Sequence, residues 1–260
     1  SDLLIPGGIA VLNADVPEFS GFRSAAEQRG VKVISYGHRG REITIVRNDL
    51  KSGGQHLHLE IFGKRHEATL PVVGAFQAMN ALCALGLAGG LRAEEYAQYL
   101  PKIQGPPGRL QLVPGHPRGT VYVDYAHTPE QLKKVYSNFK ESPKICVLGS
   151  CGGGRDKWKR GEMGKIAKEY CEKIIITNED PYDEDPMEII NQVAEGTGSK
   201  AEIILDRQEA IKRAISLAEN GDVVIITGKG SEPWMCIKNG KKIPWDDREI
   251  AKKELLSRGL

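Results

Sequence analysis

A regular alternation of short apolar runs with longer helical patterns occupies residues 120–227, and it limits the possible fold more than any other feature of the chain. The strand-like runs cover residues 120–125, 144–149, 173–178, 201–206 and 222–227. The helical patterns between them cover residues 129–140, 161–172, 186–196 and 207–220. Strands that alternate with helices of this length predict a doubly wound, mostly parallel sheet with helices on both faces.

A glycine-rich turn lies inside this pattern, between Lys144 and Arg160. Four apolar residues at 145–148 lead directly into Gly149 and a run of small residues, and a cluster of charged residues follows. In open α/β sheets, ligands bind outside the carboxyl ends of the strands, and glycines let the backbone come close to them. The basic residues after the turn favour an anion at this position. No Walker A pattern occurs anywhere in the chain.

The first hundred residues predict only part of a domain. The expected strands cover residues 9–15, 31–36, 42–47, 55–62 and 67–70, and the expected helices cover 18–30, 73–87 and 93–100. We expect the strands at 42–47 and 55–62 to be edge strands. This is too little parallel sheet to close a doubly wound domain. The Pro- and Gly-rich segment 104–109 marks a boundary, which gives domains at 1–106 and 107–260.

Composition excludes several classes of protein. The 36 basic and 34 acidic residues are spread through the chain and leave a net charge of +2, which argues against dedicated binding to nucleic acid or to a membrane surface. No apolar run reaches the length of a membrane span, and no signal peptide is visible. The five cysteines have no C-x-x-C spacing, so we expect reduced thiols, Cys146 as an ordinary core residue, and a cytoplasmic protein.

Polar residues follow several of the expected strands, where a purely structural loop would not need them. Asp124 and His127 follow one strand, five carboxylates crowd the segment 177–186 after another, and Lys229 and Glu232 follow a third. A solvated acidic loop that caps the next helix is the simpler reading of 177–186. His56, His58 and His66 lie on expected edge strands and read as surface residues. No zinc-ligand spacing is present, so we predict no metal site from protein ligands.

Six segments, in this order, resemble the motifs of the Mur ligases, and of the MurE type (UDP-N-acetylmuramoyl-tripeptide synthetases) most closely. The resemblance covers nearly the whole chain. The segments are residues 12–15, 74–80, 107–109, 123–129, 151–157 and 228–232.

The resemblance implies an ATP-dependent amide ligase of peptidoglycan synthesis. In this family ATP and Mg²⁺ convert the carboxylate of UDP-MurNAc-L-Ala-D-Glu into an acyl phosphate, which the amino group of the incoming amino acid attacks. The partners are therefore that UDP-MurNAc-dipeptide and an amino acid, with no nucleic acid and no membrane, and we expect a monomer.

The resemblance also implies roles for particular residues. On the ATP side, Asn80 would lie at the adenine, Arg109 at the phosphates and Asp124 at the ribose, with His127 beside it. On the amino-acid side, Arg155 would hold the carboxylate of the incoming amino acid. Its side-chain pocket would be lined by Asp180, Tyr182, Gly228 and Glu232.

The chain departs from the family pattern in three places. The P-loop, the magnesium-binding Glu and His, the carbamoylated lysine and the UDP-binding domain all precede Asn13 in the family. We therefore expect residues 1–106 to be the incomplete back part of the central ATP-binding domain, with no catalytic residue present and no turnover by this chain alone. Gln77 stands where the family usually has Asn.

The third departure concerns the loop that reads the added amino acid. Members that add meso-diaminopimelate usually carry Asp-Asn-Pro-Arg where this chain has Glu179-Asp-Pro-Tyr182. Tyrosine cannot form a bidentate pair with a carboxylate as arginine does. With three carboxylates at 183–185 close by, a lysine-like amino acid is favoured.

Three alternatives remain at this stage. A cyanophycin synthetase-like ligase shares much of the motif pattern, whereas a folylpolyglutamate synthase-like ligase fits residues 124–129 and 228–232 less well. A non-catalytic module that binds a nucleotide or a partner comes from a different class, because a fold alone does not decide function.

Overall fold

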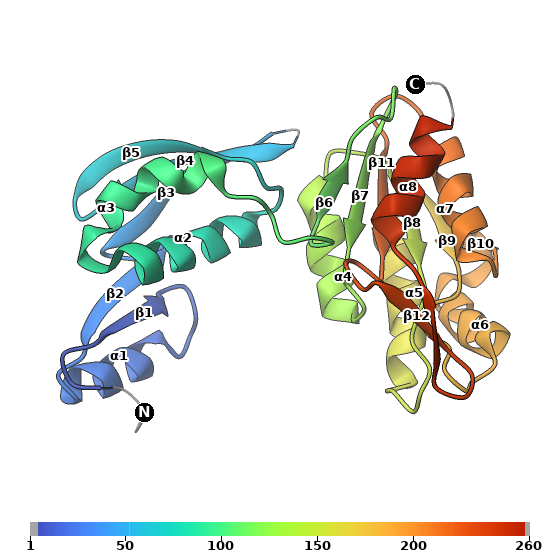
Figure 1. The fold of residues 1–260 in the computed structure, drawn as a ribbon, viewed down its shortest axis with the longest axis horizontal. Helices are drawn as coiled ribbons and strands as arrows, with labels where there is room; N and C mark the ends of the chain where they lie inside the picture. Colours follow the sequence, from blue (N-terminus) through green and yellow to red (C-terminus); the bar gives the residue numbers. More distant parts are fainter. Residues whose placement is uncertain (1–4, 52, 258–260) are drawn as a thin grey trace. The chain divides into compact units, whose positions relative to one another are not determined.

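The computed structural model describes residues 5–51 and 53–257, which form two compact units. The first unit ends at Gly105 and the second begins at Pro106. Figure 1 colours them from blue to green and from green to red, respectively. None of the helices in the described residues is both long and apolar enough to cross a membrane.

The first unit is built on a five-stranded sheet in the order β1-β2-β3-β4-β5. Strands β1 to β3 are parallel, and β3 to β5 form an antiparallel meander. Strand β4 therefore lies between two others, so the prediction that residues 42–47 and 55–62 form edge strands was wrong. The elements are β1 Ile9–Asn13, α1 Phe19–Gln28, β2 Lys32–Gly37, β3 Ile43–Lys51, β4 Gly54–Ile61, β5 Lys64–Leu70, α2 Ala75–Gly89 and α3 Ala93–Tyr96.

Strict alternation along β4 explains how this sheet buries one face. Leu57, Leu59 and Ile61 are buried, while the residues between them are half-exposed. Side chains two apart on a strand share a face, so the three apolar residues pack together with buried side chains of α2, such as Leu82 and Leu85. The sheet core is thus on the α2 side, and the intervening residues of β4 project from the other face.

The second unit contains a six-stranded sheet in the order β10-β9-β8-β11-β7-β6. All neighbours are parallel except β6 and β7, which confirms the predicted mostly parallel α/β sheet. The strands are β6 Gln111–Val113, β7 Thr120–Asp124, β8 Lys144–Leu148, β9 Lys173–Ile176, β10 Ala201–Ile203 and β11 Val223–Thr227. The helices are α4 Pro129–Tyr136, α5 Trp158–Tyr170, α6 Pro186–Thr197, α7 Arg207–Ser216 and α8 Asp247–Leu256, and β12 Trp234–Ile237 pairs with β13 Lys241–Pro244.

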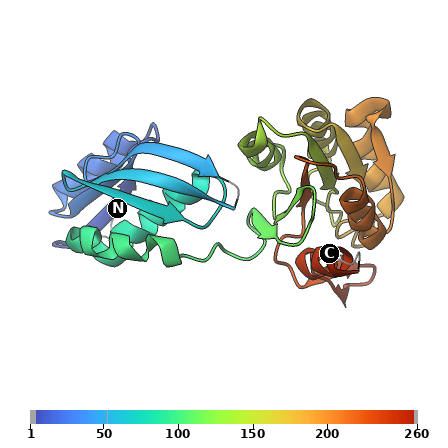
Figure 2. The same cartoon turned by 90° about the horizontal axis from the view of Figure 1, so that it is seen from above.

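Helices cover both faces of this sheet. Helices α7 and α8 pack on one face, where Ile211 and Leu255 join a cluster with strand residues such as Val147 and Val224. In Figure 2, α4, α5 and α6 lie on the other face. Strand β8 is buried along its whole length because it has helices on both sides, as expected for a central parallel strand.

Two features of this unit differ from the sequence-based expectations. Strand β6 was missed, because three residues are too few to show a period-2 pattern. Cys146 is not an ordinary core thiol: it forms a disulfide with Cys171, with the two Cα atoms 6.1 Å apart. The bond links β8 to the residue that follows α5. Cys83, Cys151 and Cys236 are free.

A fully buried ion pair joins α7 and α8 to the ends of two strands. Arg207, at the start of α7, donates from Nε and Nη2 to the two carboxylate oxygens of Asp247 over 2.9 and 2.6 Å. Nη2 also donates to the carbonyl oxygen of Thr227, and Nη1 to that of Asn178. Both charged side chains are 0% exposed. Arg207 therefore helps to hold β9, β11 and α8 in one arrangement.

We expect Arg207→Met to lower the free energy of unfolding by about 3–5 kcal/mol, because it leaves the Asp247 carboxylate buried without its partner. Arg213→Met is the matched control on the same helix. Arg213 pairs with Glu202 at the surface, where both side chains are nearly half-exposed, and its loss should cost less than about 1 kcal/mol. Urea unfolding of the two variants measures the difference, and equal losses would contradict the role assigned to Arg207.

Candidate active site

The carboxyl ends of β7, β8, β9 and β11 meet at one edge of the second sheet, because these strands are parallel neighbours. The loops that follow them, 125–128, 149–157, 177–185 and 228–233, contain most of the predicted site residues. Hydrogen bonds join these loops directly. Gly152 N donates to Asp180 O over 2.9 Å, and Tyr125 Oη donates to Glu232 Oε1 over 2.9 Å.

A buried lysine stands at the centre of this edge. The Nζ of Lys229 donates to Asp180 Oδ2 over 2.7 Å and to Glu232 Oε2 over 2.5 Å, and its side chain is 0% exposed. Burial works against the charged ammonium, but the hydrogen bonds that Lys229 donates to Asp180 and Glu232 outweigh it and raise the pKa of Lys229. Burial likewise opposes ionisation of Glu232, yet Lys229 lowers its pKa below the usual value. Lys229 and Glu232 therefore stay charged, and Lys229 stays hydrogen-bonded to both carboxylates.

Asp180 and Tyr182 hold the third loop in an unusual backbone conformation. Their φ angles are +37° and +51°, in the left-handed region that costs non-glycine residues about 1–3 kcal/mol. The conformation is held by hydrogen bonds: Asp180 Oδ1 accepts from the backbone N of Cys236 over 2.8 Å, and Tyr182 N donates to the carbonyl of the same residue. Asp180 is buried, and its carboxylate positions the neighbouring loops. The Tyr182 side chain is more exposed to solvent than that of Asp180.

Gly228 lies directly against the buried carboxylate of Glu179. Its φ is +113°, and a Cβ added there would come within 2.1 Å of Glu179 Oε2. The other oxygen of Glu179 accepts from the thiol of Cys151 over 3.1 Å. Burial raises the pKa of Glu179, and it also raises the pKa of the Cys151 thiol. A Cβ at residue 228 would therefore force the buried Glu179 carboxylate to move, in the contact between the loops after β9 and β11.

A buried arginine braces the glycine loop, and sequence reasoning missed it. In the sequence, Arg160 is only one of the charged residues that follow the glycine-rich turn. In the structure its guanidinium donates to Glu184 Oε2, to Gln192 Oε1 and to the carbonyl of Cys151 over 2.7–3.0 Å. Its side chain is 0% exposed. The only signal in the sequence was a basic residue in the first turn after the loop. Arg155, in contrast, lies on the loop and is exposed.

The acidic loop uses its carboxylates within the protein. Asp183 accepts from the backbone N of Asn239, Glu184 pairs with Arg160, and Asp185 caps α6 by accepting from Met187 N. The simpler reading of this segment, a helix-capping loop, therefore accounts for part of it. These internal partners weaken the argument that the carboxylates are present to attract a cationic amino acid.

Arg109, Tyr125 and His127 form a second group at the same edge, and Tyr125 was not among the predicted site residues. The guanidinium of Arg109 lies 4.4 Å from the centre of the Tyr125 ring, which in turn meets the His127 ring at 4.8 Å. Asp124 lies beneath them, buried, and accepts from Leu110 N over 2.6 Å and from Ala126 N over 2.7 Å. Burial raises the pKa of this carboxyl above its usual range. Asp124 thus anchors the segment that presents Arg109.

Asn80 belongs to the first unit. It is exposed on α2, where its Nδ2 donates to Oε1 of the buried Gln77 over 3.1 Å. The residue that departs from the usual family pattern therefore contacts Asn80 directly.

Sequence comparison agrees with these two units. The profile described as "Mur ligase middle domain" matches residues 2–88, and the one described as "Mur ligase, glutamate ligase domain" matches residues 108–230. The chain belongs to the Mur ligase family.

Individual Mur ligases match the chain along nearly its whole length. The relatives from Rickettsia typhi, Zymomonas mobilis and Caulobacter vibrioides are 34%, 37% and 38% identical over 99%, 97% and 95% of this chain. Each is named UDP-N-acetylmuramoyl-L-alanyl-D-glutamate–2,6-diaminopimelate ligase. The matches cover 53%, 54% and 51% of those proteins, so the chain spans about half the length of these relatives.

Solved structures give the same result at the level of the fold. A UDP-N-acetylmuramoyl-L-alanyl-D-glutamate–2,6-diaminopimelate ligase matches with a TM-score of 0.68 and 29% identity, over 97% of this chain and 54% of that one. A Mycobacterium tuberculosis folylpolyglutamate synthase in complex with ADP and AMPPCP matches with a TM-score of 0.65 and 20% identity, over 85% and 52% of the two chains. The second likeness shows a shared fold only.

We expect Gly228→Ala to destabilise this Mur ligase chain by about 2 kcal/mol more than Gly221→Ala. Both glycines have a positive φ, so both variants carry the backbone penalty. Nothing lies within 4 Å of a Cβ at Gly221, whereas a Cβ at Gly228 would overlap the Glu179 carboxylate. Urea unfolding of the two variants measures the excess. If both lose the same stability, the contact with Glu179 does not require glycine.

Proposed function

We propose that this chain is the middle and C-terminal part of an ATP-dependent ligase that adds the third amino acid to UDP-MurNAc-L-Ala-D-Glu. The observation that carries the proposal is that the loop with Arg155 and the loop with Gly228 and Glu232 follow neighbouring parallel strands, β8 and β11, in a chain that matches the Mur ligase glutamate ligase domain. The relatives named for this reaction match the chain over almost its full length.

We assign the amino-acid site to this edge because its charges are complementary to an α-amino acid. Arg155 is exposed and offers a planar guanidinium for a carboxylate. Glu232 is one-third exposed and is held as an anion by Lys229, so it is available to an ammonium group. In this assignment Asp180 acts through Lys229 and the loop backbone, as a positioning residue.

Within the second unit, the nucleotide proposal rests on Arg109 and His127. Arg109 stacks on Tyr125 and is exposed, so a phosphate group can approach it from solvent. Asp124 is buried, and both of its carboxylate oxygens already accept backbone hydrogen bonds. In this proposal Asp124 therefore supports a ribose contact indirectly, by holding Arg109 and Ala126 in place. Bound Mg²⁺ would supply charge neutralisation on the transferred phosphoryl group.

The relatives' names make 2,6-diaminopimelate the first candidate for the added amino acid. Lysine is the second candidate, because Tyr182 lacks the guanidinium that would pair with the distal carboxylate of diaminopimelate. The Tyr182 ring lies beside Gly153, where an added Cβ would come within 2.9 Å of the ring. The carboxylates at 183–185 no longer add to the argument for lysine, since each has a partner within the protein.

The test is a ligase assay on the full-length protein that contains these residues. UDP-MurNAc-L-Ala-D-Glu, ATP and Mg²⁺ are supplied with diaminopimelate, lysine and ornithine in competition, and products are identified by mass spectrometry. Amide formation together with ADP release supports the proposal, and the product mass identifies the amino acid. If no amide forms, the function lies with another ligase substrate, as in the cyanophycin or folylpolyglutamate enzymes, or with a binding module. The 260-residue chain alone is expected to release no ADP.

Arg155→Ala is expected to raise the KM for the amino acid by about 10- to 100-fold, because a charge-assisted hydrogen bond to the substrate carboxylate contributes about 1.5–3 kcal/mol. Stability should not change, since the side chain is exposed. Arg118→Ala is the control: this arginine is also exposed but lies before β7, at the opposite end of the strand. Steady-state kinetics with the amino acid varied measures the effect, and an unchanged KM would remove Arg155 from the site.

A further inference from the structure

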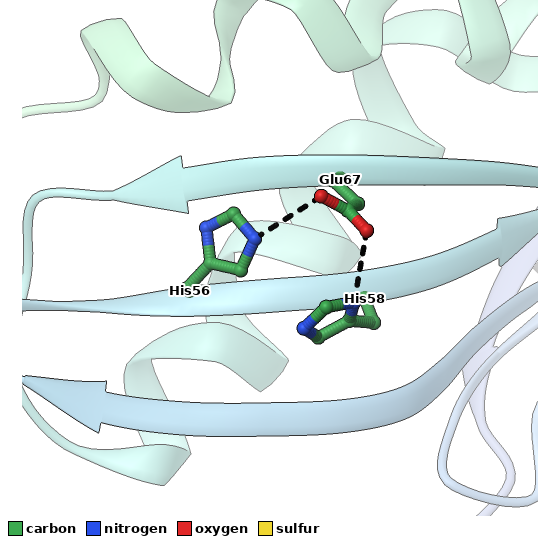
Figure 3. A group of neighbouring side chains, drawn as sticks. All are labelled: His56, His58 and Glu67. Atoms are coloured by element: carbon green, nitrogen blue, oxygen red, sulfur yellow. Dashed lines mark ion pairs between the residues drawn. The ribbon is translucent and has the colours of Figure 1, made fainter.

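Two histidines and a glutamate face one another on the antiparallel part of the first sheet. His56 and His58 are two apart on β4, so both project from the face opposite the buried Leu57 and Leu59. Glu67 on β5 is directly opposite His58 in the register. Figure 3 shows both imidazole rings turned toward the Glu67 carboxylate.

The distances within this group are short. His56 Nε2 lies 3.5 Å from Glu67 Oε2, and His58 Nδ1 lies 3.2 Å from Glu67 Oε1. One ligand atom from each residue can be chosen so that all lie within 4.8 Å of one another, and in residues 5–51 and 53–257 no other such group of three is found. In a tetrahedral zinc site with bonds of about 2.0–2.1 Å, the ligand atoms are roughly 3.3 Å apart. The group therefore needs little movement to close around a metal ion.

The far side of each imidazole ring has its own acceptor. His58 Nε2 lies 3.3 Å from Asp49 Oδ2, and His56 Nδ1 lies 3.4 Å from Thr69 Oγ1. Hydrogen bonds donated from these nitrogens leave the lone pairs on His58 Nδ1 and His56 Nε2, the two atoms that face Glu67. Outer acceptors of this kind orient the histidine ligands of metal sites and set their tautomer.

Asp49 is itself held in place. Arg47 donates to both of its carboxylate oxygens, over 2.7 and 2.6 Å. The inner and outer partners thus come from three adjacent strands: Asp49 from β3, the histidines from β4, and Glu67 from β5. The polar side chains on this face contact one another in a connected set, which side chains on an ordinary solvated surface do not need.

We propose that His56, His58 and Glu67 form a binding site for a divalent transition metal such as Zn²⁺, with Asp49 and Thr69 as outer partners. Two imidazole nitrogens and one carboxylate suit Zn²⁺, Ni²⁺ or Cu²⁺, whereas Mg²⁺ prefers oxygen ligands. Three protein ligands leave a fourth position for water or for an incoming group. The histidine side chains are 26% and 30% exposed and that of Glu67 is 67% exposed, so an ion can enter from solvent.

The test uses the untagged chain, stripped of metal with a chelator and titrated with Zn²⁺ by calorimetry. We expect one Zn²⁺ per chain, retained in millimolar Mg²⁺, and visible absorption bands typical of tetrahedral Co²⁺ when Co²⁺ replaces Zn²⁺. Glu67→Gln and His56→Gln should each weaken Zn²⁺ binding by at least about 10-fold, and Asp49→Asn by about 10- to 100-fold through the orientation of His58.

His66→Gln is the matched control, because His66 is the neighbour of Glu67 on β5 and its imidazole lies beside Glu94 instead. It should bind Zn²⁺ as the unmodified chain does. Circular dichroism checks that each variant is folded. If a histidine variant fails to fold, Glu67→Gln still tests the proposal, because the Glu67 side chain is exposed. Absence of stoichiometric binding would overturn the proposal. So would unchanged affinity in Glu67→Gln and His56→Gln, which would leave the group as an ion-pair cluster only.

Discussion

The buried ammonium group of Lys229 lies at the carboxyl edge of the second sheet, where it has no access to water and needs neighbouring carboxylates to neutralise its charge. Its partners Asp180 and Glu232 come from different loops, and Asp180 also binds the backbone of Gly152 and Cys236. One buried charge therefore connects the glycine loop, the acidic loop, the loop after β11 and β12. Loss of Lys229 would leave the buried Asp180 carboxylate without its cationic partner, which is far more costly than loss of a surface pair.

The same rule separates the buried cations of this edge from the exposed ones. Arg160 and Arg207 are fully buried, and each has carboxylate and carbonyl partners on several elements. Arg155 and Arg109 lie on the surface of the same edge. A rigid supporting network with a few open charged groups above it is the arrangement that a binding site for anionic substrates needs, because the ligand then meets groups that are already in place.

The first unit reaches a comparable result through strand pairing. The period-2 pattern of β4 that buries Leu57 and Leu59 necessarily directs His56 and His58 to the opposite face. The register with β5 then places Glu67 opposite His58. The register with β3 places Asp49 opposite His56, and its carboxylate reaches the far side of the His58 ring. A shift of one residue in either pairing would send the partner to the other face of the sheet.

Much of the second unit could be predicted from the sequence, because its strands and helices show their own periodicity and caps. The alternation of strands with helices and the mostly parallel sheet both follow from patterns of neighbouring residues. The motif order alone indicated the Mur ligase family, now supported by matches over residues 2–88 and 108–230.

Other features could not be predicted in this way. They are the internal position of β4, the short strand β6, the Cys146–Cys171 bond and the partners of Arg160 and Arg207. Local periodicity reports which side of an element faces a core, so the sequence determined the elements and their order. Which strands pair and which buried charges meet depends also on residues far apart in the chain, as when Val223 of β11 pairs with Thr120 of β7 and Arg207 with Asp247, and only the tertiary structure decided that.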